Sequence, residues 1–210
     1  MISAGSPVLD ALLGGYQPGL TLIYGPSAAG KTTLVKLAAI QQCREGKKVL
    51  YLDTEGGFSV ERFIQLAKGE DLLPSLLLLR LRDFQEQTKR ILKLDLFAEK
   101  VSLIIVDTIG MHYRVEVRND PKEANRWLDK QLKTLSAIAQ TKNLPVLLTN
   151  QVYTNPETGA YQVVGGNMLL NWSKSVIELQ KEPRCLRLRK PGEGSWGFEI
   201  VEEGLRELRK

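Results

Sequence analysis

A glycine-rich segment, GPSAAGKTT, constrains the fold of this chain more than any other feature. It occupies residues 25–33 and directly follows the apolar run LTLIY. The segment fits the pattern G-x-x-x-x-G-K-[ST], in which a loop surrounds phosphates with its own backbone N–H groups and a helix begins directly behind it. A buried strand should therefore enter the loop and a helix should leave it. The pattern in this setting predicts a phosphate-binding α/β fold.

The parts of this loop have separate roles in holding ATP and Mg²⁺. Lysine at the position of Lys31 reaches the β- and γ-phosphates, and the hydroxyl of Thr32 ligates the metal. A second metal ligand is expected at the end of a neighbouring strand, and Asp107 follows the apolar run LIIV. We therefore predict ATP and Mg²⁺ as cofactors, with Thr32 and Asp107 at the metal and Lys31 in catalysis. The predicted nucleotide-binding residues are Gly25, Pro26, Ser27, Ala28, Ala29, Gly30, Lys31, Thr32 and Thr33.

Apolar runs with strand character alternate with helical periodicity along most of the chain. Strands are expected at residues 20–25, 47–53, 76–82, 101–107 and 144–150, and helices at 31–44, after Phe58, at 83–94 and from Pro121, with Asp120 as N-cap. Continuous apolar strands separated by helices indicate a mostly parallel sheet covered on both faces. Short alternating segments within residues 175–201 predict C-terminal antiparallel hairpins. The long helix expected from Pro121 should bury one apolar stripe, formed by Ala124, Trp127, Leu128, Leu132, Leu135, Ile138 and Ala139.

Two carboxylates, Asp53 and Glu55, stand one residue apart where the second strand ends. Open α/β sheets bind ligands at the carboxyl ends of their strands, so both acids should lie near the phosphates. Glu55 has the longer side chain and lies farther out, and we expect it to polarise the attacking water. Asp53 is expected to hold the turn or the outer shell of Mg²⁺. The alternative for Glu55 is an ordinary solvated acid in a loop.

Composition narrows the setting of the protein. The net charge of +5 and pI of about 9.2 permit a polyanionic partner without requiring one. The two cysteines, Cys43 and Cys185, are far apart in sequence, so neither a disulfide framework nor a zinc site is expected and a reduced cytoplasmic location fits best. No secretory leader opens the chain, and the longest apolar stretch, LLPSLLLL, is too short to cross a bilayer.

Four segments together resemble the RecA-like recombinases of archaea and eukaryotes, and most closely the archaeal RadB group. They are LDALLGGYQPGLTLIYGPSAAGKTT, YLDTEGGFSVERF, LIIVDTIG, and LLTNQV followed by VVGGNMLLNWS. The resemblance runs through nearly the whole chain in order and spacing. It implies a RecA-like P-loop ATPase core in which Glu55 is the catalytic glutamate. It also implies that Gln151, at the end of the fifth strand, senses the γ-phosphate and transmits its state to a second DNA loop, which looks short here, between Gln151 and Gly165.

The resemblance further implies an ATP-binding, DNA-binding accessory protein of DNA repair and homologous recombination, with weak Mg²⁺-dependent ATPase activity and no strand exchange of its own. We expect one core domain over residues 1–210, without the helix-hairpin-helix domain and aromatic-x-x-Ala segment of the main archaeal recombinases. The implied partners are single-stranded or branched DNA bound without sequence preference, the RadA recombinase, a junction-resolving nuclease and further copies of the chain, associated with the nucleoid. A KaiC-like or DnaB-like ATPase and a nucleotide-dependent binding module remain alternatives.

Candidate DNA contacts lie in two places. Residues 111–120, MHYRVEVRND, are predicted to leave the metal strand as a loop in which Arg114 and Arg118 meet phosphates. Gly165, Gly166 and Asn167 open a helix whose free N–H groups could bind a phosphate. The alternative for residues 111–120 is a solvated loop. The alternative for residues 165–167 is a tight turn with Asn167 as N-cap.

The basic segment PRCLRLRKPGEG near the C-terminus allows two interpretations. Arg187 and Arg189 alternate with Leu186 and Leu188, as on an edge strand that carries charge to avoid aggregation. The second hypothesis is that Arg189 or Lys190 reaches the γ-phosphate bound by a neighbouring subunit, which would require an oligomer.

Overall fold

The structure is a computed structural model that describes residues 1–154 and 161–208. In this part of the chain the strands form a ten-stranded sheet in the order β10-β9-β8-β7-β1-β5-β4-β2-β3, with β6 paired to β5 alone. The strands are β1 (Gly19–Gly25), β2 (Val49–Asp53), β3 (Leu76–Arg80), β4 (Leu103–Asp107), β5 (Pro145–Thr154), β6 (Tyr161–Val163), β7 (Ser175–Lys181), β8 (Arg184–Lys190), β9 (Gly194–Val201) and β10 (Gly204–Glu207). The strands from β3 to β7 in this order pair in parallel, and β7 to β10 pair antiparallel. The predicted architecture is confirmed.

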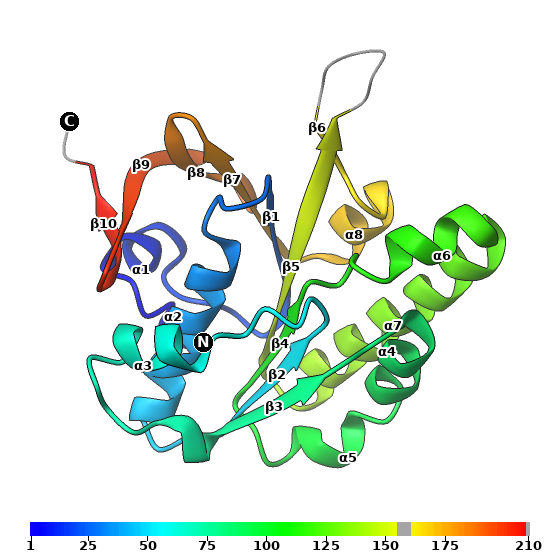
Figure 1. The fold of residues 1–210 in the computed structure, drawn as a ribbon, viewed down its shortest axis with the longest axis horizontal. Helices are drawn as coiled ribbons and strands as arrows, with labels where there is room; N and C mark the ends of the chain where they lie inside the picture. The colour runs from blue at the N-terminus through cyan, green and yellow to red at the C-terminus, as the bar shows by residue number, and fades with distance from the viewer. Residues whose placement is uncertain (155–160, 209–210) are drawn as a thin grey trace.

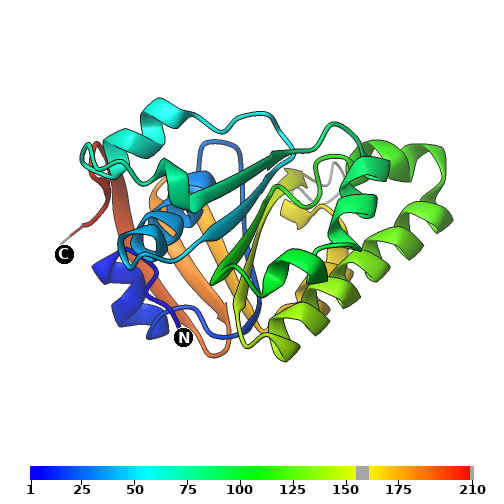
Figure 2. The ribbon, with the colours of Figure 1, turned by 90° about the horizontal axis from the view of Figure 1, so that it is seen from below.

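Helices cover both faces of the sheet (Figures 1 and 2). One layer contains α1 (Pro7–Leu13), α2 (Lys31–Arg44) and α3 (Val60–Leu66), and the other contains α4 (Phe84–Ile91), α5 (Asp95–Ala98), α6 (Tyr113–Asn119), α7 (Pro121–Thr141) and α8 (Gly166–Trp172). Successive side chains of a strand point to opposite faces of the sheet, so Ile23 packs with α2 in one helix layer and Leu22 packs with α7 in the other. A short 3₁₀ turn, η1 (Leu73–Ser75), precedes β3. No helix in the described ranges is long and apolar enough to cross a bilayer.

Helix α7 follows its predicted pattern closely. The Asp120 side chain accepts a hydrogen bond from the Glu123 N–H at 2.9 Å, as expected of an N-cap, and Pro121 is the first helical residue. The predicted stripe is buried apart from Trp127, which is half-buried. The stripe also contains Gln131, which apolar periodicity cannot predict because the residue is polar. Gln131 can be buried because its amide forms hydrogen bonds with buried partners on α4.

Several expected boundaries were wrong for identifiable reasons. Residues 113–119 form helix α6 instead of a loop, because Tyr113 is buried and its hydroxyl donates to Asn125 Oδ1 at 2.7 Å. The helix expected at residues 83–94 ends at Ile91 as α4, and a separate short helix, α5, begins beyond the expected range at Asp95. Strand β5 continues past Gln151 because its last residues pair with β6, so Gln151 lies inside the strand. Strand β8 pairs with β7 and β9 and is therefore not an edge strand.

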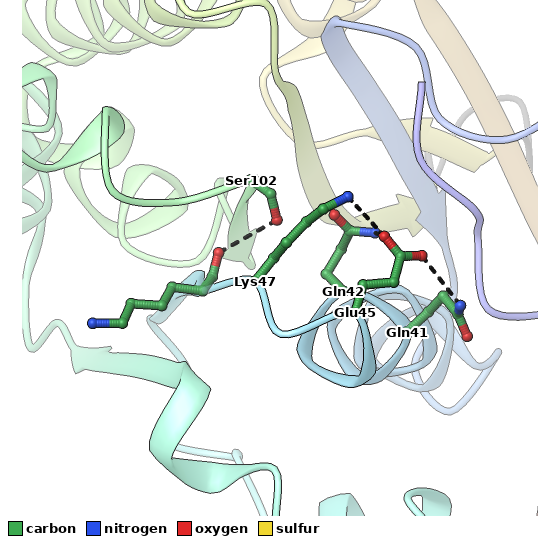
Figure 3. A network of polar contacts seen from close by, with 6 residues as sticks. Gln41, Gln42, Glu45, Lys47 and Ser102 are labelled. Atoms are coloured by element: carbon green, nitrogen blue, oxygen red, sulfur yellow. Dashed lines mark hydrogen bonds and ion pairs between the residues drawn. The ribbon is translucent and has the colours of Figure 1, made fainter.

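A polar cluster fixes the end of α2 that lies away from the phosphate-binding loop (Figure 3). The Glu45 carboxylate accepts hydrogen bonds from Gln41 at 3.2 Å, Gln42 at 3.3 Å and Lys47 at 2.7 Å. The Lys47 ammonium, as the largest cause, lowers the pKa of Glu45. The backbone N–H of Ser102 donates to the Lys48 carbonyl at 2.9 Å, which joins the segments entering β4 and β2. The contacts of Glu45 thus join the end of α2 to the segment that leads into β2.

Candidate nucleotide site

The phosphate-binding loop lies between β1 and α2, as predicted, and packs against the C-terminal strands. Its glycines are required by close approach: a Cβ on Gly25 would lie 2.3 Å from the Leu179 carbonyl oxygen, and one on Gly30 would lie 3.2 Å from Ile200 Cδ1. Gly30 is the N-cap of α2 with φ 110, and Ala28 also has a positive φ of 61. Strands β7 and β9 therefore help to set the shape of the loop.

The Lys31 side chain is folded back into its own loop. Its Nζ donates to the carbonyl oxygens of Gly25 at 2.9 Å and Pro26 at 2.8 Å, and the residue is buried. Burial lowers the pKa of Lys31, while the negative charges of Asp107 and Glu55 act in the opposite direction. Phosphate oxygens would be stronger acceptors for this ammonium than the two carbonyl oxygens. The Lys31 ammonium can therefore exchange its hydrogen bonds to the carbonyls for hydrogen bonds to the phosphates of a nucleotide.

Asp107 closes β4 beside the loop. Its Oδ2 accepts hydrogen bonds from Thr32 Oγ1 at 2.9 Å and from the Tyr51 hydroxyl at 2.5 Å, and its Oδ1 accepts one from Thr149 Oγ1. Burial, followed by the charge of Asp107, raises the pKa of Tyr51 well above its usual value, so the phenol stays a donor. A carboxylate and a threonine hydroxyl side by side at the loop are the hard oxygen ligands that Mg²⁺ prefers, so these residues fit the predicted metal.

The two neighbouring carboxylates have different surroundings. Asp53 is buried and accepts hydrogen bonds from the N–H groups of Gly57 at 3.3 Å and Phe58 at 3.1 Å, so it fixes the turn. Glu55 is exposed, but its Oε1 accepts from Thr108 Oγ1 and from Gln151 Nε2, both at 2.8 Å. The turn brings Glu55 beside Gln151, on the side of the sheet edge where the loop lies.

Thr54 explains the position of Glu55. Its Oγ1 donates to the Thr108 carbonyl at 2.7 Å and accepts from the Thr108 N–H at 2.8 Å. The turn after β2 is thus attached to the residue that follows Asp107. The sequence analysis did not predict Thr108 as a site residue, although a hydroxyl directly after the predicted metal ligand Asp107 was a usable signal.

A cavity of about 230 Å³ joins these groups beside the loop. It is lined by Ser27, Ala28, Gly30, Lys31, Thr32, Thr33, Glu55, Thr108, Gln151 and Ile200. Gly25 and Pro26 line an adjoining cavity, Ala29 is buried beneath the loop, and Asp107 touches the site through Thr32. The predicted nucleotide, metal and catalytic residues therefore meet at one place. Ile200 was not predicted, because nothing in the sequence shows that β9 approaches the loop.

A second cavity of about 760 Å³ lies between α6 and the β5–β6 hairpin, which projects beyond the rest of the sheet in Figure 1. It is lined by Tyr113, Arg114, Val115, Val117, Arg118, Gln151, Val152, Tyr153, Val163, Val164, Gly165 and Gly166. An Arg114 guanidinium N–H donates to Gln151 Oε1 at 3.3 Å. Gln151 therefore belongs to both cavities and joins Arg114 to Glu55.

The GGN segment does begin a helix, α8, but Asn167 is not its N-cap. Gly165 occupies that position with φ 82, and Asn167 is an exposed residue of the first turn. Asn150 on β5 fixes the segment by donating from Nδ2 to the Val164 carbonyl at 2.6 Å. Residues 155–160 of the predicted second DNA loop lie outside the described part of the chain.

The basic residues of the tail have partners within the chain. Arg189 Nε donates to Glu178 Oε2 at 2.7 Å, and Lys190 Nζ donates to the Ser173 carbonyl at 2.7 Å. A different basic residue of the tail, Arg184, contacts the phosphate-binding loop, because its guanidinium donates to the Ala28 carbonyl at 2.9 Å. Action of Arg189 or Lys190 on a neighbouring subunit stays a prediction.

The parallel sheet and the loop between β1 and α2 define a RecA-like P-loop protein. The Rad51 family model matches residues 1–194. The chain is 38% identical to the DNA repair and recombination protein RadB of Thermococcus sibiricus over 225 residues, covering 100% of this chain and 96% of that one, and 38% identical to RadB of Methanocaldococcus jannaschii, covering 93% and 97%. A crystal structure of the RadB recombinase superposes with TM-score 0.82 at 35% identity, covering 100% of both chains. The chain belongs to the RadB group of the Rad51 family.

Proposed function

We propose that this protein binds Mg·ATP at the P-loop, hydrolyses it slowly and acts on DNA as an accessory protein of repair and homologous recombination. The observation that carries the proposal is the convergence of Lys31, Thr32, Glu55 and Gln151 on one cavity. Membership of the RadB group supports the DNA repair role and favours it over a KaiC-like or DnaB-like function. We extend the proposal to a single core domain over residues 1–210 and to RadA, a junction-resolving nuclease and further copies of the chain as partners.

The residues of the cavity divide the chemistry of hydrolysis among them. The N–H groups of the loop and the Lys31 ammonium bind the phosphates and stabilise the charge that develops on them. Thr32 and Asp107 would hold Mg²⁺, and a bound Mg²⁺ would supply neutralisation of phosphate charge. Glu55 holds the attacking water in line, and the Gln151 amide donates to the γ-phosphate.

We attribute the proposed slow turnover to the contacts of Glu55 and Gln151. Glu55 Oε1 already accepts from Thr108 and Gln151, and Gln151 Oε1 accepts from Arg114. A catalytic arrangement must exchange these hydrogen bonds for bonds to water and phosphate. The hydrogen bonds among Glu55, Gln151, Thr108 and Arg114 therefore compete with the catalytic arrangement.

The second cavity is the proposed DNA site. Arg114 and Arg118 supply positive charge on one wall, and Tyr153 of β5, which is 50% exposed, lines the other side. Guanidinium groups bind the backbone phosphates, and exposed aromatic rings stack on unpaired bases. Neither contact reads base identity, so binding should be tolerant of sequence.

Replacing both Arg114 and Arg118 with alanine should weaken binding of labelled single-stranded DNA by a similar factor for every sequence. Each lost phosphate contact should reduce the slope of log affinity against log salt by about 1. Fluorescence anisotropy over a salt series measures both effects. The Arg126→Ala, Lys133→Ala double variant, on the outer face of α7, removes the same charge and should keep most of the affinity. Equal losses in the two variants would show a non-specific charge effect, and unchanged binding in the first would place the site elsewhere.

A further inference from the structure

The Asp107 carboxylate is held from both sides by buried hydroxyl groups. Strand β4 lies between β2 and β5 in the sheet, and each neighbour contributes one group. Tyr51 of β2 donates to Oδ2 at 2.5 Å, and Thr149 of β5 donates to Oδ1. Both Tyr51 and Thr149 have 0% exposure. Each carboxylate oxygen therefore has its own donor, which comes from a different strand.

The register of the sheet explains how Tyr51 reaches Asp107. Asp53 is paired with Asp107 across β2 and β4, so Tyr51, two residues earlier, points to the same face of the sheet. Its ring packs edge-on against Phe58, with centroids 4.9 Å apart and an interplanar angle of 74°. The Phe58 N–H in turn donates to Asp53 at 3.1 Å. The phenol is thus fixed by packing as well as by its hydrogen bond.

We propose that Tyr51 and Thr149 are positioning residues that orient the Asp107 carboxylate for Mg²⁺, an inference that rests on the proposed nucleotide site. An aspartate without these donors could rotate about its side-chain bonds and lose its alignment with Thr32. Partners that orient a metal ligand in this way usually contribute a factor of about 10–100 to metal affinity. Neither hydroxyl lines the nucleotide cavity, so removal of the Tyr51 hydroxyl should act through Asp107. Thr149 Oγ1 also lies 3.2 Å from Thr108 Oγ1, so Tyr51→Phe is the more specific of the two substitutions.

The alternative is that the two hydroxyls only satisfy a buried carboxylate. A buried charge needs hydrogen-bond donors for folding whether or not it binds a metal. Loss of a donor would then lower stability and change nucleotide affinity in the presence and absence of Mg²⁺ alike. The two roles therefore differ in the metal dependence of binding.

The test is a Mg²⁺ titration of ATP binding by fluorescence with a labelled ATP analogue, together with binding in EDTA and a melting curve. For Tyr51→Phe, which removes only the hydroxyl, we expect the Mg²⁺ midpoint to rise about 10-fold or more while affinity in EDTA stays at the wild-type value. Thr149→Val should shift the midpoint in the same direction. The matched control is Tyr16→Phe, because Tyr16 is buried and its hydroxyl has no hydrogen-bond partner among the described residues. Its midpoint should equal that of the wild type.

The outcomes separate this inference from the function on which it rests. If wild-type binding shows no Mg²⁺ dependence, the proposed metal site is wrong and the inference with it. If the wild type depends on Mg²⁺ but Tyr51→Phe and Thr149→Val titrate as it does, only the positioning role is overturned. A parallel loss of affinity with and without Mg²⁺, accompanied by a lower melting temperature, would also overturn it in favour of the folding role.

Discussion

Glu55→Gln is expected to bind Mg·ATP as the wild type does and to hydrolyse it about 10²–10⁴-fold more slowly, the range of acid–base effects. Glutamine keeps the length of the side chain and can still accept from Thr108, so the turn after β2 should survive. It loses the negative charge that we propose polarises the attacking water. In the proposed site the loop, Lys31 and Thr32 hold the phosphates, and the substitution leaves them in place. Phosphate release under single-turnover conditions and calorimetric ATP binding measure the two quantities.

Asp53→Asn is the matched control for this prediction. It makes the same carboxylate-to-amide change two residues earlier, at a side chain that holds the turn through the N–H groups of Gly57 and Phe58. One amide oxygen can keep part of that bonding, so turnover should fall less than in Glu55→Gln. The reverse ranking would show that Asp53, and not Glu55, acts on the water.

Lys31→Ala should lose most of its affinity for ATP. The ammonium would make charge-assisted hydrogen bonds to the phosphates, and such bonds contribute about 1.5–3 kcal/mol each. Loss of one such bond corresponds to a roughly 10–150-fold larger dissociation constant, that is, weaker binding. Isothermal titration calorimetry with Mg·ATP measures it directly.

Lys36→Met provides the comparison for Lys31. Lys36 is a second buried lysine of α2, but its Nζ lies 3.3 Å from the Ser59 carbonyl oxygen and 4.5 Å from the centroid of the Phe58 ring, not on the loop carbonyls. Its removal takes the same charge from the same helix, and we expect a clearly smaller loss of ATP affinity. Similar losses in both variants would mean that general positive potential, and not the Lys31 contact, binds the phosphates.

The elements with strong local patterns were predictable from the sequence. The helix expected at residues 31–44 is α2 (Lys31–Arg44), because the glycine loop fixes its start. The five apolar strands were also found at the expected places. The elements that were missed are short: α6 buries little beyond Tyr113, and β6 has only three residues, two of them exposed. Such segments depend on partners that are distant in sequence, so their own periodicity is weak.

The site shows the same division between local pattern and spatial arrangement. Lys31, Thr32 and Asp107 were predicted because each stands in or next to a strong motif. Glu55 was chosen over Asp53 for its longer side chain and its position farther out, and Gln151 was added by resemblance. The hydroxyls of Tyr51, Thr108 and Thr149 were missed as site groups, since their roles arise from neighbouring strands. A sequence read segment by segment does not show that β4 lies between β2 and β5. Without that order, nothing indicates which hydroxyls meet Asp107.

The most direct test of a DNA-associated ATPase is phosphate release by the wild-type protein with saturating Mg·ATP, in the presence and absence of single-stranded DNA, with Glu55→Gln as background. We expect slow release that clearly exceeds this background. We also expect the rate to change when DNA is added, because Gln151 contacts both Arg114 in the proposed DNA site and Glu55 in the nucleotide site. A wild-type rate that equals that of Glu55→Gln and does not change with DNA would contradict the proposed DNA-associated ATPase. The protein would then be at most a nucleotide-dependent binding module.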